Sequence, residues 1–311
     1  MKQTSVLSLL LLLGTSSANN YQNVALRGRA SMSERIADLY GFASNAIDGN
    51  RESNYSVGSC TSTVEMANPW WRVDLLESYT ITSIIIINRG DCCAGKLNMA
   101  RVHIGNSLEN NGASNPVAGI IYHVPSGMSL KMTFTEHVEG RYVTVVLRGL
   151  KKTLTLCEVE VYGYRVPTGE NLALQGKASQ SSLHSTGIAY NAIDGNRASD
   201  WAKGSCTHTE NNLNPWWRLD LGKTHKIFSV KITNYKNNPL YINGAEIKIG
   251  DSLDNDGNNN PRCAVISSIP GGFTETFQCN GMDGRYVNIV IPGRTGYLTL
   301  CEVEVYGSRL D

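Results

Sequence analysis

Residues 80–88 read Thr-Ile-Thr-Ser-Ile-Ile-Ile-Ile-Asn, and this stretch decides the fold class. It is rich in β-branched residues, which pack well on a pleated sheet and are stiff in a helix. A similar run returns at residues 226–234, and apolar residues alternate with others at residues 141–147, 157–162 and 285–291. Turns rich in Gly, Asn, Pro and Ser separate these runs, and helical periodicity is nearly absent. The sequence therefore predicts an all-β chain folded as an antiparallel β-sandwich or jelly roll.

The sequence contains the same pattern twice, and the strand at residues 80–88 belongs to the first copy. Four short segments recur in the second copy: the first three lie 146 residues further along (45 and 191, for example), and the last lies 144 residues further along (157 and 301). Two copies this long are self-sufficient domains, so we expect tandem domains at residues 21–163 and 170–311 with a linker at 164–169. The recurring segments are Asn-Ala-Ile-Asp-Gly-Asn at 45–50 and 191–196, Gly-Ser-Cys-Thr at 58–61 and 204–207, Asn-Pro-Trp-Trp-Arg at 68–72 and 214–218, and Cys-Glu-Val-Glu-Val at 157–161 and 301–305.

Charge and the amino-terminal segment limit the possible partners and compartment. The chain carries 28 Lys and Arg against 27 Asp and Glu, so no field steers it to nucleic acid or an acidic membrane. Residues 1–18 have the charged, apolar and small-residue regions of a secretory signal peptide. No later run is long and apolar enough for membrane insertion. We therefore expect a secreted, extracellular protein, with Asn54 in the one Asn-X-Ser/Thr acceptor for a glycan.

In an oxidising compartment the eight cysteines are interpreted as disulfides. Cys60 and Cys157 both have counterparts in the second copy, whereas the other two pairs occur in one copy only. Cysteines that appear and vanish together are most simply bonded to each other; the alternative is free thiols or other partners. The predicted bridges are Cys60–Cys157, Cys206–Cys301, Cys263–Cys279 and a vicinal bridge, Cys92–Cys93.

The ten residues 87–96, Ile-Asn-Arg-Gly-Asp-Cys-Cys-Ala-Gly-Lys, concentrate polar chemistry in one turn. Arg89 and Lys96 bracket the adjacent cysteines, and both offer fixed donors to a small polar ligand. A vicinal bridge closes almost no loop, so stability does not explain it; it would make an apolar sulfur surface on which a ligand can stack. We interpret the turn as a binding site. The alternative is a surface turn in which Arg89 pairs with Asp91.

A second candidate site gathers oxygen-bearing side chains where the predicted Cys60–Cys157 bridge closes the domain. Hard oxygen ligands without His or free thiolate suit calcium rather than zinc. The spacing is not that of an EF-hand, and the alternative is a turn in which Asp48 or Asp194 accepts backbone N–H groups. The candidate ligands are Asn45, Asp48, Asn50, Ser59 and Glu158 in the first copy, and Asn191, Asp194, Asn196, Ser205 and Glu302 in the second.

With these motifs in place, each copy resembles the F-type lectins, a fucose-binding family common as tandem forms in fish. The resemblance covers essentially the whole mature chain and rests on the recurring segments together with Asn-Arg-Gly-Asp-Cys-Cys at residues 88–93. It implies two discoidin-like jelly-roll domains, one structural calcium ion per domain and a shallow fucose pocket between loops. It also implies that a His, an Arg, an Asp, a second cation and a vicinal disulfide contact the sugar.

The first copy keeps most of that sugar-binding pattern. Arg89, Asp91 and Lys96 match it, as do Cys92 and Cys93. At the position of the His stands Ser62, whose hydroxyl can still donate one hydrogen bond.

The second copy keeps the complementary part, His208 alone, and is a degenerate site. We expect no fucose binding of the family type there. Aromatic residues of this copy either line a different sugar pocket or belong to the framework. The replaced positions are Tyr235, Asn237, Asn238, Pro239 and Ile242, and the aromatic candidates are Trp201, Tyr235 and Tyr241.

The sequence thus predicts a secreted, calcium-dependent or calcium-stabilised lectin that recognises terminal L-fucose or a related sugar on glycans, chiefly through the first domain, in innate immune recognition. Agglutination needs several sites, so a single active domain per chain would require a homo-oligomer. The alternative is an adhesion or protein-interaction module with decayed sugar binding that uses the Arg89-Gly90-Asp91 turn. No Ser/His/Asp or Cys/His set recurs in motif context, so we expect no enzyme.

Overall fold

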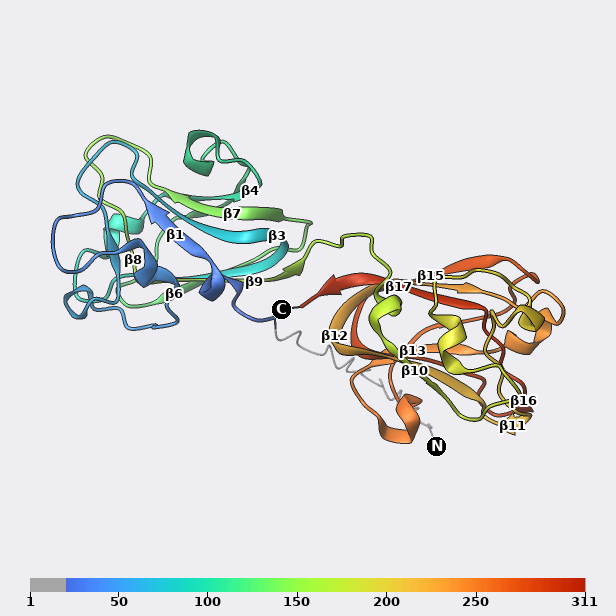
Figure 1. The fold of residues 1–311 in the computed structure, drawn as a ribbon. Helices are drawn as coiled ribbons and strands as arrows, with labels where there is room; N and C mark the ends of the chain where they lie inside the picture. The colour runs from blue at the N-terminus through green and yellow to red at the C-terminus, as the bar shows by residue number, and fades with distance from the viewer. Residues whose placement is uncertain (1–20, 311) are drawn as a thin grey trace, which may run out of the picture.

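The computed structural model describes residues 21–310, which form two all-β domains joined end to end (Figure 1). The signal peptide expected at residues 1–18 lies outside the described residues. Within 21–310, the helical segments are short 3-10 turns, and none could cross a membrane. The expected all-β class and tandem architecture are confirmed.

The first domain is built on a seven-stranded sheet in the order β1-β3-β7-β4-β5, with β6 and β9 also paired to β3. All of these pairs are antiparallel. The strands are β1 (Arg29–Met32), β3 (Trp70–Ile87), β4 (Ala100–Gly105), β5 (Val117–Ile121), β6 (Ser129–Thr133), β7 (Glu139–Val146) and β9 (Glu158–Arg165), and a small second sheet pairs β2 (Thr61–Ser62) with β8 (Thr155–Leu156).

The second domain repeats this plan with a six-stranded sheet in the order β10-β12-β15-β13-β14, with β17 paired to β12. One continuous strand, β15, takes the place of β6 and β7. The strands are β10 (Lys177–Gln180), β12 (Trp216–Thr233), β13 (Glu246–Gly250), β14 (Arg262–Val265), β15 (Thr274–Val290) and β17 (Glu302–Arg309), and a small sheet pairs β11 (Asn212–Leu213) with β16 (Thr295–Gly296).

Short 3-10 turns connect the strands in both domains and carry much of the loop surface. They are η1 (Val24–Arg27), η2 (Ala43–Ile47), η3 (Tyr55–Val57), η4 (Ala94–Leu97), η5 (Glu109–Gly112), η6 (Leu172–Gln175), η7 (Ala189–Ala192), η8 (Trp201–Lys203), η9 (Pro239–Ile242) and η10 (Asp254–Gly257).

A buried tryptophan ties the core to a functional turn in each domain. Trp71 on β3 and Trp217 on β12 are fully buried. A buried indole N–H needs an acceptor, and the two donate to the carbonyl oxygens of Ala43 and Ala189, each at 2.9 Å. These carbonyls open the turns that hold the recurring Asn-Ala-Ile-Asp-Gly-Asn segments. The core strand therefore fixes where the oxygen-rich turn lies.

All four predicted disulfides are present, and no cysteine is free among the described residues. Cys60–Cys157 and Cys206–Cys301 join residues 97 and 95 positions apart. In the chain-entropy model, closing a loop of that length stabilises a domain by about 4–5 kcal/mol. Each of these two bridges therefore ties the early loops of its domain to the last strand.

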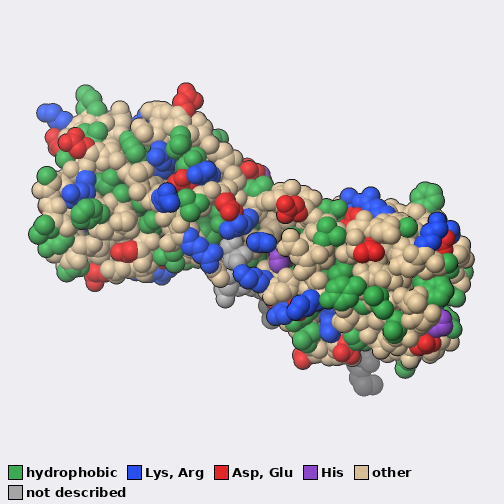
Figure 2. Space-filling model, in the orientation of Figure 1, with side chains coloured by type: hydrophobic (Ala, Val, Ile, Leu, Met, Phe, Trp, Pro, Cys, Tyr) green, Lys and Arg blue, Asp and Glu red, His purple; other side chains and the backbone are tan. Residues whose placement is uncertain are grey.

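The domains meet through the segment that joins them. Strand β9 continues to Arg165, so it takes in the first two residues of the expected linker. The ring of Tyr164 lies 5.8 Å from that of Phe228, and the buried Lys226 ammonium lies 5.3 Å from Tyr164 and 5.2 Å from Tyr21. On the face in Figure 2, charges of both signs are interspersed over both domains, as expected for a net charge of +1.

Candidate functional site

A buried asparagine shapes the turn that follows β3. The Asn88 amide donates to the carbonyl oxygens of Ala94 (3.1 Å) and Val124 (2.8 Å), and its own oxygen accepts from the Arg89 backbone N–H (2.9 Å). Asn234 plays the same part in the second domain. Asn88 was not among the residues predicted from the sequence, although its recurrence as Asn234 at the common spacing was a usable signal. The hydrogen bonds of this side-chain amide fix the backbone conformation of the candidate binding turn.

The middle of the turn is clamped between two other loops. The backbone N–H of Gly90 donates to Ser53 O (2.7 Å), and the Ser126 hydroxyl donates to Gly90 O (2.7 Å). A Cβ on Gly90 would collide with the Ser53 hydroxyl. It would also lie 3.2 Å from the Cα of Gly127, so glycine at position 90 avoids crowding from both neighbouring loops.

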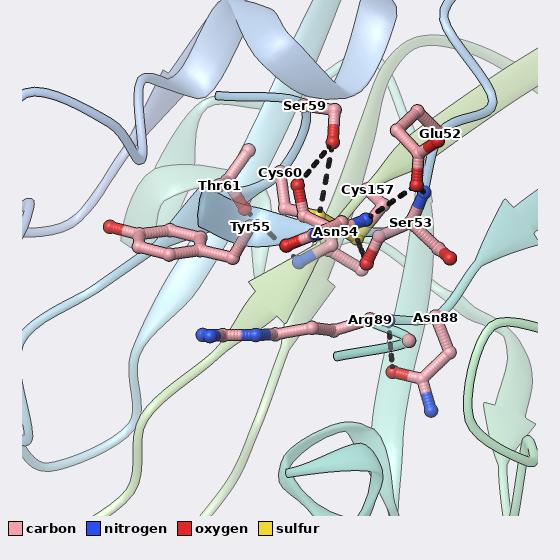
Figure 3. The surroundings of a disulfide bond; sticks show 12 residues. Glu52, Ser53, Asn54, Tyr55, Ser59, Cys60, Thr61, Asn88, Arg89 and Cys157 are labelled. Atoms are coloured by element: carbon pink, nitrogen blue, oxygen red, sulfur yellow. Dashed lines mark hydrogen bonds between the residues drawn. A yellow bond between two sulfur atoms is a disulfide. The ribbon is translucent and has the colours of Figure 1, made fainter. Parts of the chain in front are cut away.

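Arg89 is held by a bidentate ion pair and an aromatic ring. Its Nε and Nη2 donate to the two Asp91 carboxylate oxygens at 2.9 and 2.7 Å, which is the pairing weighed as an alternative. Its guanidinium carbon lies 4.3 Å from the Tyr55 ring centroid, and Figure 3 shows the side chain running beneath that ring. The hydrogen bonds from Arg89 lower the pKa of Asp91 to about 2. A guanidinium has five N–H donors, so three form no hydrogen bond to another residue of 21–310 and remain for a ligand.

Tyr55 is a site residue that was not predicted from the sequence. Its hydroxyl donates to Asp38 (2.5 Å), and its backbone N–H donates to Asp91 (3.0 Å). Burial, and then the bond to Asp38, raise the pKa of Tyr55 well above its usual value. The only sequence signal at this position was Trp201, the aromatic residue that replaces it in the second copy. Tyr55 therefore links the turn after β3 to the loop around residues 35–42.

The vicinal disulfide and the second cation complete this turn. Cys93 adopts a left-handed conformation with φ of 61° and precedes η4, and its carbonyl accepts from the Lys96 N–H (2.9 Å). Lys96 is half-buried and forms no ion pair within residues 21–310. The predicted residues Arg89, Asp91, Cys92, Cys93 and Lys96 therefore share one rigid turn.

Ser62 was expected to donate a hydrogen bond to a ligand, but the structure places its hydroxyl differently. It lies on β2, is 4% exposed, and its hydroxyl donates to Thr63 O at 3.4 Å. Its hydroxyl is already engaged by the chain, so the first domain offers ligands one side-chain donor fewer than the family pattern.

The oxygen-rich closure contains one orphaned carboxylate oxygen in each domain. Glu158 is fully buried; its Oε1 accepts from the Gly49 N–H at 3.2 Å, and its Oε2 has no partner among the described residues. Burial and the nearby Asp48 raise the pKa of Glu158 to about 8. Glu302 repeats each of these features. Leaving a buried carboxylate oxygen unpaired is costly, so this chemistry fits a hard cation.

The turns weighed as the alternative to a metal site are also present. Asp48 accepts from the Asn50 N–H at 2.8 Å, and Asn50 accepts from the Glu52 N–H at 3.0 Å. Asp194 and Asn196 do the same in the second domain. No group of three His, Cys, Asp or Glu residues within 21–310 is arranged to hold a metal. A cation here would therefore also need amide and backbone oxygens.

The remaining candidate ligands are engaged by hydrogen bonds of their own. The Asn45 and Asn191 amides donate to Cys60 O (3.2 Å) and Cys206 O (3.0 Å), which leaves both amide oxygens available. The Ser59 and Ser205 hydroxyls donate to carbonyl oxygens five residues earlier. Among the predicted ligands, a cation would stabilise two carboxylate pairs most, Glu158 with Asp48 and Glu302 with Asp194, because each pair brings two negative charges together and leaves one buried oxygen without a partner among the described residues.

In the second domain, the predicted His208 lines a hollow of about 350 Å³. The aromatic residues suggested by the sequence line it too, so they belong to a pocket rather than to the framework. His184, which the sequence analysis did not select, forms part of the wall. The lining residues are His184, Trp201, His208, Tyr235, Asn237, Asn238 and Tyr241.

Similarity to known proteins identifies the family. A family model described as "NedA-like, galactose-binding domain" matches residues 45–145 and 191–289. Fucolectin-4 of Anguilla japonica is 54% identical over 143 residues, which are 45% of this chain and 79% of that protein. The crystal structure of an F-lectin from striped bass (Morone saxatilis) serum is 67% identical with a TM-score of 0.87, covering 94% of this chain and 100% of that one. The chain belongs to the F-type lectin family. F-type lectin membership confirms the discoidin-like fold and the expectation of a lectin, not an enzyme.

Proposed function

We propose that this F-type lectin is secreted and binds terminal L-fucose or a related sugar chiefly through its first domain. The observation that carries the proposal is the Arg89 guanidinium, which Asp91 and Tyr55 hold in place while three of its N–H donors stay free. Lys96 and the Cys92–Cys93 bridge lie in the same turn. The fucolectins of eels and the F-lectin of striped bass serum support both the ligand class and secretion.

The chemistry of this turn suits a deoxy sugar. Sugar hydroxyl and ring oxygens accept hydrogen bonds from Arg89 and Lys96, and charge-assisted bonds of this kind are stronger than neutral ones. The apolar disulfide packs against C–H groups and the methyl group. Because Ser62 does not supply the family's additional donor, binding is weaker by about 1 kcal/mol, the usual net worth of one hydrogen bond.

Calcium is proposed as a structural cofactor, one ion per domain. Glu158, Asp48 and Asn45 would hold it in the first domain, and Glu302, Asp194 and Asn191 in the second. The ion would supply positive charge that keeps the buried glutamate ionised. The protein side chains would then tie the oxygen-rich turn to the last strand of each domain.

The decisive experiment is calorimetric titration of the full chain with methyl α-L-fucopyranoside. Arg89→Ala removes the fixed donors, and we expect affinity to fall at least tenfold, about 1.4 kcal/mol. Arg141→Ala is the matched control, because it removes a similar bidentate pair with Asp74 on the strand framework. Unchanged fucoside affinity in Arg89→Ala would contradict the proposal.

An adhesion function that uses the Arg89-Gly90-Asp91 turn is less consistent with this geometry. A receptor that reads both charges needs them separate, whereas here the guanidinium and the carboxylate bind each other.

Agglutination in innate defence further requires several linked sites, so we propose a homo-oligomer. Light scattering of the purified full chain would test it, and a monomer at agglutinating concentrations would exclude it.

A further inference from the structure

The Asn-Tyr-Ser segment at residues 54–56 has the acceptor pattern for an N-linked glycan and lies against the candidate binding turn. Ser53 O accepts from the Gly90 N–H at 2.7 Å, and the Tyr55 N–H donates to the Asp91 carboxylate at 3.0 Å. The residues on both sides of Asn54 therefore contact the binding turn directly, and Figure 3 shows Asn54 between them. A group attached to Asn54 stands at the edge of that turn.

Hydrogen bonds within the segment fix the orientation of the Asn54 side chain. Its Oδ1 accepts from the Ser56 backbone N–H at 3.0 Å and from the Ser56 hydroxyl at 2.6 Å. A backbone N–H can only donate, so the side-chain atom that faces it must be the oxygen, and Nδ2 points the other way. This nitrogen forms no hydrogen bond within residues 21–310, and it is not buried. It is therefore open to solvent.

The backbone of Asn54 is anchored on its inner side, so a group on Nδ2 leaves outwards. The Asn54 carbonyl oxygen accepts from the Ser59 hydroxyl at 2.7 Å, next to the buried Cys60–Cys157 bridge. On the outer side, Ser56 and Val57 are exposed, Val57 by 63%. A bulky, hydrated glycan can therefore extend from Nδ2 without disturbing the packed interior.

The second domain has the same turn without the acceptor. At the common offset of 146 residues, Asp200 takes the place of Asn54, and Ala202 takes that of Ser56. The Asp200 side chain accepts from the Ala202 N–H at 3.2 Å, which is the hydrogen bond that Asn54 makes, and it also pairs with Lys236 at 2.8 Å. The turn itself thus needs only a side-chain oxygen. The outward nitrogen of Asn54 is additional to that need.

From this arrangement we propose that Asn54 carries an N-linked glycan and that this glycan limits access to the fucose site. In the transfer, Asn54 Nδ2 forms a bond to C1 of the first sugar of a polyprenyl-diphosphate-linked oligosaccharide. The bond from C1 to the diphosphate oxygen breaks, the polyprenyl diphosphate leaves, and the amide loses one proton. The modification depends on the proposed secretion, and the effect on access rests on the fucose site proposed above.

A glycan at this edge discriminates between ligands by size. A free fucoside is small enough to reach Arg89 and Lys96 past the glycan. A fucose held close to a protein surface must bring that surface against the glycan, which restricts both partners and costs affinity. The first domain therefore selects fucose at the end of extended chains over fucose close to a protein surface.

The test compares Ser56→Ala, which removes the acceptor pattern, with the matched control Ser56→Thr, which keeps it. Full chains are secreted from an insect cell line, and mass spectrometry before and after peptide N-glycosidase treatment measures occupancy of Asn54. We expect a glycan on the native chain and on Ser56→Thr, and none on Ser56→Ala. We also expect Ser56→Ala to bind serum albumin that carries α-L-fucose on a short linker severalfold more tightly than Ser56→Thr, with equal affinity for methyl α-L-fucopyranoside.

A second variant without the acceptor is Asn54→Asp, which copies Asp200 and keeps the side-chain oxygen, and it serves if Ser56→Ala does not fold. An unmodified Asn54 in the native secreted chain, or equal albumin affinity in Ser56→Ala and Ser56→Thr, would overturn the proposal. Absence of fucoside binding from every variant would overturn the effect on access through the proposed function itself. The mass measurement decides the modification separately.

Discussion

The two domains share a framework and differ at their loop tips. Each has a buried tryptophan bonded to the same turn, an Arg–Glu pair whose glutamate lies on the last strand of the domain, and an Asp–Arg pair between neighbouring strands of the main sheet. The matched pairs are Arg51–Glu160 with Arg197–Glu304, and Asp74–Arg141 with Asp220–Arg285. Because each of these contacts has at least one partner on a strand of the main sheet, they hold both folds while loop residues differ. One scaffold therefore carries two different pockets.

The pockets differ in the kind of interaction they offer. In the first domain, two cations and a sulfur surface lie in one short turn, so the recognition proposed there would depend on charge-assisted hydrogen bonds. In the second, the equivalent turn contributes Tyr235 and Asn237, and its partners are aromatic rings from other loops. The same framework thus carries a charged turn in one copy and an aromatic pocket in the other.

The largest expected effect is on thermal stability, and it distinguishes the disulfides that stabilise the fold from the vicinal disulfide that forms a binding surface. Replacing Cys206 and Cys301 together with Ser should cost about 4–5 kcal/mol and lower the unfolding temperature of the second domain markedly. Replacing Cys92 and Cys93 together should leave that temperature almost unchanged, because no sizeable loop opens, yet weaken fucoside binding. Differential scanning calorimetry and titration measure the two effects. Equal thermal losses would refute this division.

Calcium removal should affect both domains alike, because both contain the orphaned glutamate oxygen. At a calcium concentration a hundred times the dissociation constant, the bound ion would add about 2.7 kcal/mol to stability. A chelator should therefore lower both unfolding transitions. In Glu158→Gln, only the transition of the second domain should still respond to calcium. A chelator without effect on either transition would rule out the structural ion.

A smaller effect should come from restoring the missing histidine. Ser62→His places an imidazole where the second domain already has His208. One added hydrogen bond is worth about 1 kcal/mol, so fucoside affinity should rise about fivefold in calorimetric titration. Ser62→Ala is the control and should leave affinity nearly unchanged, since the Ser62 hydroxyl bonds to Thr63 O. A rise in both variants would argue against a role for the imidazole.

The smallest expected effect is a pH response confined to the second domain. Burial, and then the neighbouring His184, lower the pKa of His208, against the opposing influence of Glu210. The unfolded chain therefore takes up a proton first, so stability is complete above about pH 6.5 and declines as pH falls below that value. Calorimetry between pH 8 and 5 should show the second transition falling in the native protein and a flatter dependence in His208→Gln. A parallel fall in His208→Gln would assign the response to other groups.

Much of the fold was predictable because its signals are local or repeated. The β-branched run at residues 80–88 coincides with the end of β3 to within one residue, and the alternating runs coincide equally well with parts of β7, β9 and β15. The disulfides followed from cysteines that occur in pairs across the two copies. The turn of residues 87–96 was recognisable because its polar groups are contiguous in the sequence.

The remaining site residues were less visible because they come from distant loops. Tyr55 precedes Arg89 by more than thirty residues, and the strand pairing of the sheet brings their loops together. His184 joins the second pocket in the same way, and Tyr297, from the other end of that domain, stacks on His208. Ser62 was expected to offer a donor, but a two-residue strand turns its hydroxyl towards Thr63 O.

The sequence by itself determined the duplication, the strands and the cysteine pairs, because these depend on side-chain alternation and on comparing one copy with the other. Only the tertiary structure decided that Arg89 is held by Asp91 beneath Tyr55, and that histidines and aromatic residues from separate loops enclose one pocket. The physical reason is that strands obey short-range periodicity, whereas the loops at one edge of a jelly roll are brought together by pairing between distant strands.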